Sequence, residues 1–245
     1  MSLPELMKND AALQSPRSVN HETSGAGGDK PRPYTKDIAA IVLAAGRSER
    51  MGAFKPLLPF GPTTVIETCI ENLRGGGVET VVVVLGQGLR AESLKEHLKS
   101  ARVSFAINSE PQSEMSASIA CGVRELPVAI KAVIINPADH AAVPAEVIAL
   151  LISEWKKGAR LVKPTWNGRG GHPVLIDLSF RDELLSLDPD AGLKAFFSLH
   201  QPQVKRVPVN SNYIARDLNT WDDYRALHQE VFGVPPPALP ARERR

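Results

Sequence analysis

The chain has 245 residues, of which 43% are hydrophobic and 23% are charged, and its formal net charge is +2. This composition is ordinary for a globular protein, and the small net charge argues against a protein that wraps nucleic acid. No apolar run approaches the roughly 20 residues of a membrane-spanning helix, and the first residues lack the apolar core of a secretory signal. Two widely separated cysteines, Cys69 and Cys121, suit reduced thiols in or near the core. Together these features predict a cytoplasmic protein with neither nucleic-acid nor membrane partners.

Composition divides the chain into three regions. Residues 1–36 are rich in Ser, Gly, Pro, Asn and charge without apolar periodicity, which predicts a disordered leader. Residues 234–245 are Pro-rich and then basic, which is typical of an extended tail. We expect one folded domain over residues 37–233.

Strand-like and helix-like segments alternate within this domain. Short apolar runs predict buried strands, and amphipathic segments with capping residues and glycine stops predict helices. The alternation predicts an α/β fold in one domain, with a three-layer, Rossmann-like, mostly parallel sheet and helices on both faces. In chain order, we expect strands at 38–43, 80–85, 103–107, 132–135, 160–163, 173–176 and 204–207, and helices at 63–74, 91–99, 116–123, 144–157 and 220–231.

A glycine-bearing loop directly follows the first predicted strand, at the sheet edge where ligands bind in such folds. Gly46 and Gly52 let backbone N–H groups approach a phosphate, and Arg50 and Lys55 add two cations. The spacing fits neither a Walker A loop nor Gly-x-Gly-x-x-Gly. Two interpretations remain: a loop that binds a triphosphate, or a glycine-rich turn with surface cations.

The same segment, LAAGRSERMGAFK, resembles the LAAGxSxRMGxxK signature of the MobA-like NTP transferases. The resemblance covers roughly residues 37–232 and implies a GT-A-type domain. It implies that Lys55 stabilises charge at the α-phosphate as a catalytic cation, and that Arg50 holds the β- and γ-phosphates that leave. The residues implied to wrap the NTP are Leu43, Ala44, Ala45, Gly46, Arg47 and Ser48.

The start of the segment also bears on the nucleotide. GTP-using members of the family usually have Leu-Ala-Gly-Gly, whereas this chain has Leu-Ala-Ala-Gly at residues 43–46. This resembles the CTP-using branch, typified by molybdenum cofactor cytidylyltransferase. The resemblance therefore favours CTP.

Asp139 is the first candidate ligand for the Mg²⁺ that accompanies an NTP. It follows the predicted strand 132–135, at the ligand-binding edge of the sheet. The family has Gly-Asp-x-Pro here, with the Asp as metal ligand, whereas this chain has Ala138 and Ala141 at the flanking positions. The alternative is that Asp139 caps the helix that begins near Pro144.

Asp217 is the second candidate Mg²⁺ ligand. The segment RDLNTWDD resembles the Asp-Ile-Asp-Thr-Pro-Glu-Asp stretch of the family, in which the early Asp completes the metal site. Asn219 replaces the second Asp and Trp221 replaces the Pro. Thr220 and Asp223 also form a capping-box pattern for the last helix.

Nucleotide contacts are also predicted in two further loops. One is the loop with Gly86, after the strand 80–85. The other contains Asn108 and Ser118, in a stretch that resembles the family's N-P…G-M-x-x-S segment, where the base and ribose bind. Glu114 stands where the family has Gly. The alternative is that the serines cap the next helix.

The acceptor side is predicted from two weaker matches. His172 lies in Gly171-His172-Pro173-Val174, which resembles the G-H/N-P-V-L segment of the molybdenum cofactor branch. Lys194 follows Gly192-Leu193 and resembles a G-x-R/K element that meets an acceptor phosphate. The alternative for His172 is a solvent-facing loop histidine.

The resemblance implies transfer of CMP from CTP to a phosphorylated small molecule of the molybdopterin type, with release of pyrophosphate and with a molybdoenzyme as a further partner. Three alternatives stay open. The acceptor is a sugar, polyol or isoprenoid phosphate; or the departures at Glu114, Ala138, Ala141 and Asn219 leave a nucleotide-binding module with weakened catalysis; or the domain is a flavodoxin-like binding protein without transferase activity.

Overall fold

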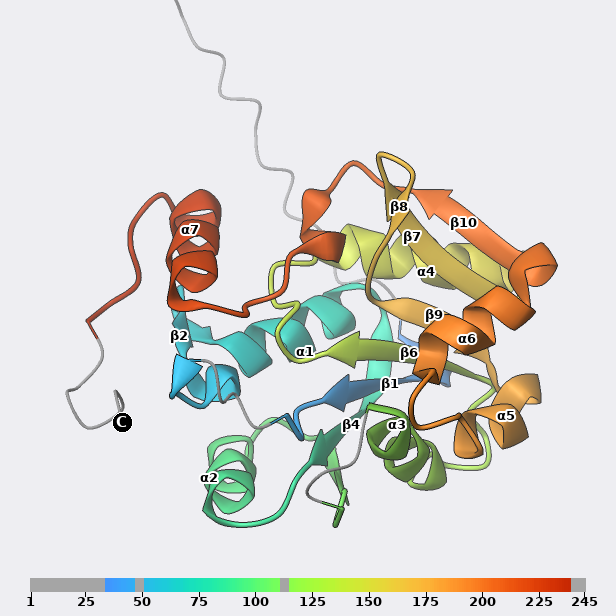
Figure 1. The fold of residues 1–245 in the computed structure, drawn as a ribbon, viewed down its shortest axis with the longest axis horizontal. Helices are drawn as coiled ribbons and strands as arrows, with labels where there is room; N and C mark the ends of the chain where they lie inside the picture. Colours follow the sequence, from blue (N-terminus) through green and yellow to red (C-terminus); the bar gives the residue numbers. More distant parts are fainter. Residues whose placement is uncertain (1–33, 47–50, 111–114, 239–245) are drawn as a thin grey trace, which may run out of the picture. The chain divides into compact units, whose positions relative to one another are not determined.

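The computed structural model describes residues 34–46, 51–110 and 115–238, so the predicted leader falls almost entirely outside the described residues. Its strands are β1 (Thr35–Leu43), β4 (Val78–Leu85), β5 (Ser104–Ile107), β6 (Ala132–Pro137), β7 (Leu161–Trp166), β8 (Arg169–Gly170), β9 (Val174–Asp177) and β10 (Val204–Pro208). They form a sheet in the order β10-β7-β9-β6-β1-β4-β5, with β8 paired to β7 (Figure 1).

The central part of the sheet is parallel, as predicted. Strand β1 runs parallel to β4 and β6, β4 runs parallel to β5, and β10 runs parallel to β7. Strand β9 is antiparallel to both of its neighbours, β6 and β7. A buried apolar run does not encode the direction of its strand, so the sequence predicted β9 without its orientation.

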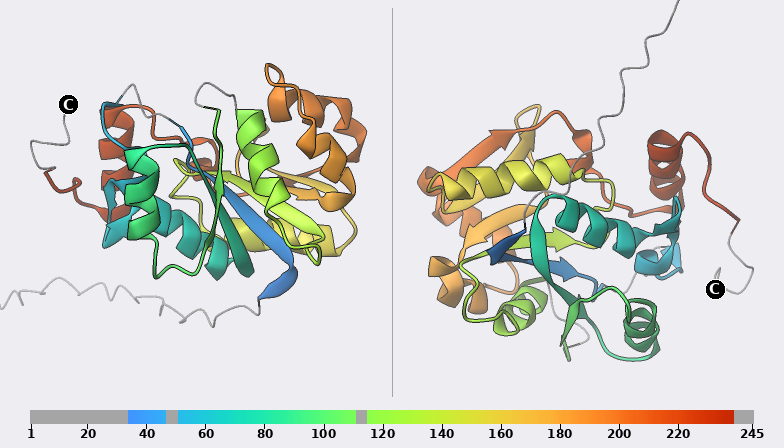
Figure 2. Two further views of the ribbon diagram at one scale, coloured as in Figure 1. Left: turned by 90° about the horizontal axis from the view of Figure 1, so that it is seen from below. Right: turned by 180° about the vertical axis from the view of Figure 1, so that it is seen from behind.

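Helices cover both faces of the sheet, which confirms the predicted three-layer α/β architecture. The helices are α1 (Val65–Gly75), α2 (Leu89–His97), α3 (Met115–Arg124), α4 (Ala145–Lys156), α5 (Arg181–Leu185), α6 (Gly192–Leu199) and α7 (Trp221–Phe232). Buried side chains of α1, α2 and α4 pack in one apolar cluster with one face of the sheet. Those of α3 and α6, together with Phe180 and Leu184, pack on the other face (Figure 2).

Local sequence patterns explain where α1 and α7 begin, and a glycine explains how closely α3 packs on the sheet. Thr64 and Glu67 form a capping box at the start of α1, and Thr220 and Asp223 form the predicted one at the start of α7. At Gly122 in α3, an added Cβ would lie 2.7 Å from Ile41, so only glycine allows α3 to approach the sheet this closely.

A third apolar cluster lies beyond the carboxyl ends of the strands. It includes Phe60 from a short hairpin, formed by β2 (Pro59–Phe60) and β3 (Thr63–Thr64), and Tyr224 from α7. The hairpin strands have two residues each, which is too short for a periodicity to predict. This cluster supports the loops described next.

Two further predictions, on membrane-spanning helices and on the cysteines, can be compared with the described residues. None of the helices there is both long and apolar enough to cross a bilayer. Cys69 and Cys121 are free thiols, the first buried and the second partly buried, as predicted.

Candidate active site

Three segments that are distant in the sequence bring a lysine and two carboxylates into one polar cluster. The Nζ atom of Lys55 lies 3.4 Å from Oδ2 of Asp139 and 3.3 Å from Oδ1 of Asn219. The side-chain amide of Asn219 donates a hydrogen bond to Oδ2 of Asp217. The predicted catalytic lysine and both predicted metal ligands therefore meet, although 84 residues separate Lys55 from Asp139.

Asp139 is held at the carboxyl end of β6 by backbone hydrogen bonds. The N–H of Ala138 donates to the carbonyl of Leu43, at the end of the neighbouring strand β1. The capping alternative for Asp139 is wrong, because Pro144 occupies the N-cap position of α4 and no side chain caps that helix. The carboxylate instead faces Lys55, with a quarter of the Asp139 side chain exposed.

The third apolar cluster fixes the relative positions of these segments. Met51, Ala141 and Leu218 are all buried in it, and each lies close in sequence to one member of the polar cluster. The indole N–H of Trp221 donates a 2.9 Å hydrogen bond to the carbonyl of Met51, which ties the end of the glycine-bearing loop to the Asp217 segment. Ala141 and Trp221, which both differ from the family's pattern, therefore help to hold the segments of the site together.

The donor set suits a metal that arrives with a nucleotide. No group of three His, Cys, Asp or Glu side chains within the described ranges could hold a metal ion by itself. Mg²⁺ is commonly held by one or two carboxylates together with substrate phosphates and water. Asp139 and Asp217, joined through Asn219 and Lys55, fit that pattern and do not fit an all-protein cage.

The glycine-bearing loop is described at its two ends. Leu43, Ala44, Ala45 and Gly46 lie at the carboxyl end of β1, and Ala44 donates a backbone hydrogen bond to the carbonyl of Val84. An added Cβ at Gly86 would lie 3.4 Å from the carbonyl of Ala45, so the predicted loops after β1 and β4 are neighbours. The predicted contacts Arg47, Ser48 and Arg50 lie outside the described residues, as does Glu114.

Asn108 and Ser118 meet each other in the structure. The side-chain amide of Asn108 donates a 2.9 Å hydrogen bond to Oγ of Ser118, and both residues are buried. Asn108 also accepts a hydrogen bond from the backbone N–H of Glu110. These contacts give the pair a role in fixing the loop after β5 against α3, and their direct contact with a nucleotide stays a prediction.

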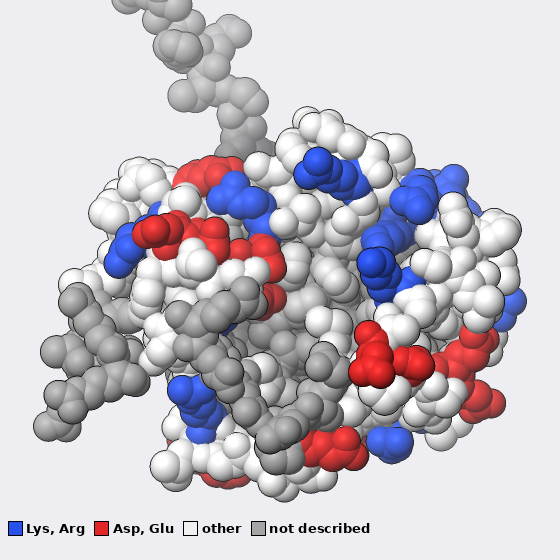
Figure 3. All heavy atoms as spheres, viewed as in Figure 1, with Lys and Arg blue, Asp and Glu red and all other residues white. Residues whose placement is uncertain are grey.

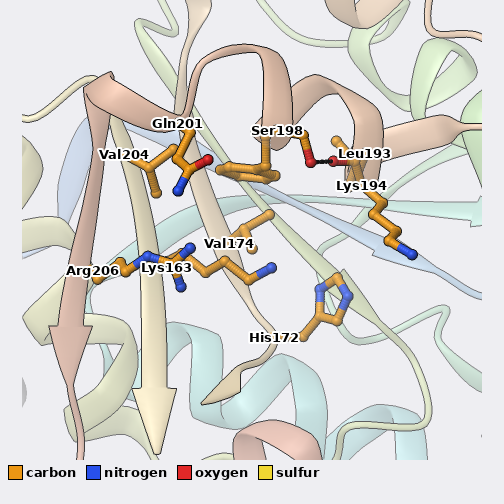
Figure 4. Close-up of a pocket in the computed structure, with 10 residues that line it drawn as sticks. Lys163, His172, Val174, Leu193, Lys194, Ser198, Gln201, Val204 and Arg206 are labelled. Carbon is orange, nitrogen blue, oxygen red and sulfur yellow. Dashed lines mark hydrogen bonds between the residues drawn. The ribbon is translucent and has the colours of Figure 1, made fainter. Parts of the chain in front are cut away.

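The two predicted acceptor residues line one pocket, with a volume of about 270 Å³. His172 and Lys194 lie there with Lys163 of β7 and Arg206 of β10, two cations that the sequence analysis missed (Figure 4). A lysine in the otherwise apolar strand 161–166 was a signal that could have identified the first of them.

A pair of histidines lies between this pocket and the polar cluster. The rings of His140 and His172 have centroids 5.3 Å apart, and His140 follows Asp139 directly. Among the described residues, Nδ1 of each ring lacks a hydrogen-bond partner. His172 is therefore not the solvent-facing loop histidine of the alternative interpretation, since it is mostly buried and packs against a second imidazole.

The environment of His172 predicts loss of stability in acid. Burial, followed by the nearby His140 and Lys163, lowers the pKa of His172 from 6.5 to about 4, and Asp217 opposes this shift. Between these pH values the unfolded chain binds a proton that the folded chain does not, so stability falls as the pH falls. We expect a loss of roughly 2 kcal/mol between pH 7 and pH 5 from this group.

Urea denaturation of wild type and of His172→Asn at both pH values measures this contribution. The free energy of unfolding should depend less on pH in the variant, because asparagine does not titrate. An equal pH dependence in the two proteins would contradict the assignment.

Comparison with known proteins identifies the family. The model of the MobA-like NTP transferase domain matches residues 40–206. This chain belongs to that family of nucleotidyltransferases. The predicted family is thus confirmed, and the match includes the glycine-bearing loop and ends within β10.

Two curated proteins are similar in sequence to this chain. Nicotine blue oxidoreductase of Paenarthrobacter nicotinovorans is 25% identical over 200 residues, which cover 78% of this chain and 96% of that protein. The 2-C-methyl-D-erythritol 4-phosphate cytidylyltransferase of Rhodococcus opacus is 31% identical over 132 residues, which cover 52% of this chain and 55% of that protein.

Solved structures agree with the fold. A homologue of Rv0371c from Mycobacterium sp. strain JC1 has a TM-score of 0.70 at 24% identity, covering 80% of this chain and 96% of its own. The manganese complex of Rv0371c from Mycobacterium tuberculosis has a TM-score of 0.67 at 22% identity, covering 79% of this chain and 98% of its own. Both structures therefore share the fold of this chain at a sequence identity below 25%.

Proposed function

We propose that this nucleotidyltransferase transfers CMP from CTP to a phosphorylated small molecule of the molybdopterin type and releases pyrophosphate. The observation that carries the proposal is the 3.4 Å contact between Lys55 and Asp139, which links the glycine-bearing loop to a carboxylate at the end of β6. A cation and an acid in contact are what a magnesium nucleotide needs from a protein: a partner for phosphate oxygens and a partner for the metal.

The roles of the residues follow from charge. A phosphorylated acceptor is already ionised, so its attack needs positioning and charge neutralisation rather than a strong general base. Lys55 would hold the α-phosphate, and Asp139 and Asp217 would hold Mg²⁺. A divalent cation held by these two carboxylates would supply positive charge to the phosphates during transfer.

Lys55 contacts Asp139 directly. Phosphates and metal entering together would separate the two side chains, because each then gains a stronger partner. Lys55 thus offsets the charge of one of the two carboxylates in the cluster, which limits the cost of desolvating that carboxylate.

The choice of CTP rests on the Leu-Ala-Ala-Gly start of the loop, and the relationship to a cytidylyltransferase from Rhodococcus opacus is consistent with it. The choice of Mg²⁺ rests on the two carboxylates, and the manganese complex of a structural neighbour is consistent with a divalent cation. The molybdopterin-type acceptor and a molybdoenzyme partner rest on the resemblance alone. The protein is proposed to act in the cytoplasm, which its ordinary globular composition and its free thiols Cys69 and Cys121 support.

A pyrophosphate-release assay tests the proposal. Wild-type protein is incubated with CTP, GTP or ATP, with Mg²⁺ or EDTA, and with a panel of acceptors: molybdopterin, a sugar phosphate, a polyol phosphate and an isoprenoid phosphate. We expect release only with a phosphorylated acceptor and a divalent cation, and fastest with CTP.

Other outcomes would point elsewhere. Binding of CTP in calorimetry without pyrophosphate release from any mixture would favour a binding module. Because one relative is named as an oxidoreductase, the absorbance of added NADPH is followed in parallel. Oxidation of NADPH without any nucleotidyl transfer would overturn the proposal.

A further inference from the structure

The pocket beside His172 gathers positive charge that the proposed chemistry does not use. Lys163, Lys194 and Arg206 line it together with His172, and no Asp or Glu of the described residues is among the lining side chains. Figure 3 shows the blue side chains gathered on this face, over β7, β10 and α6. The three cations come from three different elements of the fold, so tertiary structure brings them together.

Two of these cations are placed at an energetic cost. Lys163 and Arg206 are register partners on the adjacent parallel strands β7 and β10. Like charges that face each other across strands destabilise a sheet. Burial, followed by the charge of Arg206, lowers the pKa of Lys163. No carboxylate contributes to the electrostatic environment of Lys163 within the described part of the chain.

Lys205, the residue next to Arg206 on β10, does have a carboxylate partner. Its Nζ atom pairs with Oε2 of Glu154 at 3.5 Å. Side chains of adjacent strand residues point to opposite faces, so Lys205 and Arg206 meet different surroundings. Glu154 of α4 thus supplies a carboxylate on the face of β10 where Lys205 lies. On the opposite face, no Asp or Glu of the described residues lines the pocket with Lys163 and Arg206.

The interior of the pocket suits a ligand with both charged and apolar parts. Val174, Leu193 and Phe197 contribute apolar surface, and Nζ of Lys163 lies 5.4 Å from the centre of the Phe197 ring. Figure 4 shows the amino groups of Lys163 and Lys194 ending on either side of the His172 ring, with Arg206 beside Lys163.

The pocket is distinct from the place where the reacting phosphate must lie. None of Lys55, Asp139, Asp217 and Asn219 lines it, and its His172 packs against the ring of His140 at a centroid distance of 5.3 Å. A phosphate that attacks the α-phosphate has to lie in the polar cluster. An anion in the pocket is therefore a different group.

We infer that Lys163, Lys194 and Arg206 bind a second anionic group of the acceptor, a carboxylate, a phosphate or a group of similar charge, at the end remote from its reacting phosphate. The substrate class is then a phosphomonoester that carries a further anion, with its middle part passing His172 and the apolar wall. The identification of the ligand as the acceptor rests on the proposed function, whereas the existence of an anion site does not depend on it.

Calorimetry with inorganic phosphate and with malonate, in chloride buffer without metal or nucleotide, tests the site. We expect one or both anions to bind wild type, and the dissociation constant to rise roughly 10- to 100-fold in Lys163→Met and in Arg206→Gln. Lys205→Gln, on the other face of the same strand, should bind as wild type does. The relative affinities of the two anions distinguish a phosphate from a carboxylate ligand.

Thermal unfolding gives a readout that a purely structural role would not reproduce. Without added anions, Arg206→Gln should melt about 1–3 °C higher than wild type, because it removes a like-charge contact. A structural role for Arg206 predicts a lower melting temperature instead. The inference is overturned if neither anion binds wild type, if binding survives in both pocket variants, or if Lys205→Gln weakens binding as much as the pocket variants do.

The transferase assay tests the proposed function separately from the anion site. In the transferase assay, the anion that binds the pocket should compete with the acceptor and not with CTP. Anion binding that depends on Arg206, without any pyrophosphate release from CTP, would leave the anion site standing and refute the transferase proposal. Pyrophosphate release by a protein whose pocket binds no anion would do the reverse.

Discussion

Replacing Asp139 by Asn should reduce metal-dependent pyrophosphate release by at least about 100-fold while the protein stays folded. The substitution keeps the size of the side chain and removes the charge that a metal ligand requires. It also removes an ion pair with Lys55, although Lys55 keeps its contact with Asn219. Because both side chains are mostly buried, losing the pair should lower the free energy of unfolding by about 1–3 kcal/mol, which leaves a typical domain folded.

A second aspartate supplies a matched control. Asp222 pairs with Arg225 at 3.0 Å on the surface of α7, and its side chain is 95% exposed. Asp222→Asn makes the same chemical change away from the polar cluster and should retain full activity. The measurement is the initial rate of pyrophosphate release at saturating CTP and Mg²⁺, with circular dichroism to check folding. Activity of Asp139→Asn within threefold of wild type would remove Asp139 from the metal site.

The central sheet could be predicted from the sequence because strands that are buried on both faces consist of continuous apolar residues. Continuous apolar runs such as residues 38–43 and 80–85 are typical of parallel strands that are covered on both faces, and both runs became central strands. The helix start at Thr220 could also be predicted, since a capping box is a local pattern. The direction of β9 could not, because strand direction is decided by the connections around it.

The polar cluster was predicted in part for a similar reason. Asp139 ends a strand at the edge where parallel sheets bind ligands, and Lys55 closes a loop at the same edge, so topology alone required them to approach. The participation of Asn219 was not foreseen. Its departure from the family pattern suggested weakened catalysis, whereas its amide links Asp217 to Lys55 in the structure.

The basic pocket shows the limit of such reasoning. Lys163 and Arg206 become neighbours through the pairing of β7 with β10, and neither residue belongs to a recognisable motif. Periodicity within a strand reports which face a residue occupies but not which residue lies opposite on the next strand. His172 and Lys194 were proposed as acceptor residues by weak local matches, and their common pocket became visible only in three dimensions.

The second large effect is expected at a glycine that joins the two halves of the site. Gly171 lies between β7 and the 3₁₀ turn Asn212–Ala215, and its N–H donates to the carbonyl of Pro164. The N–H of His172 donates to the carbonyl of Ile214 at 2.8 Å. An added Cβ at Gly171 would lie 2.1 Å from that carbonyl oxygen and 2.6 Å from its carbon. Because both are backbone atoms, the turn itself would have to move.

Gly171→Ala should therefore destabilise the protein by about 3 kcal/mol, which lowers the melting temperature by roughly 6–12 °C. Gly170→Ala is the matched control, because its Cβ would meet only the flexible side chain of Lys163, which can shift. The turn leads within three residues to Asp217, so the Gly171 variant that remains folded should lose both acceptor affinity and turnover. Equal melting temperatures for the two variants would show that the turn yields easily, and that Gly171 does not fix the distance between the acceptor pocket and the carboxylates.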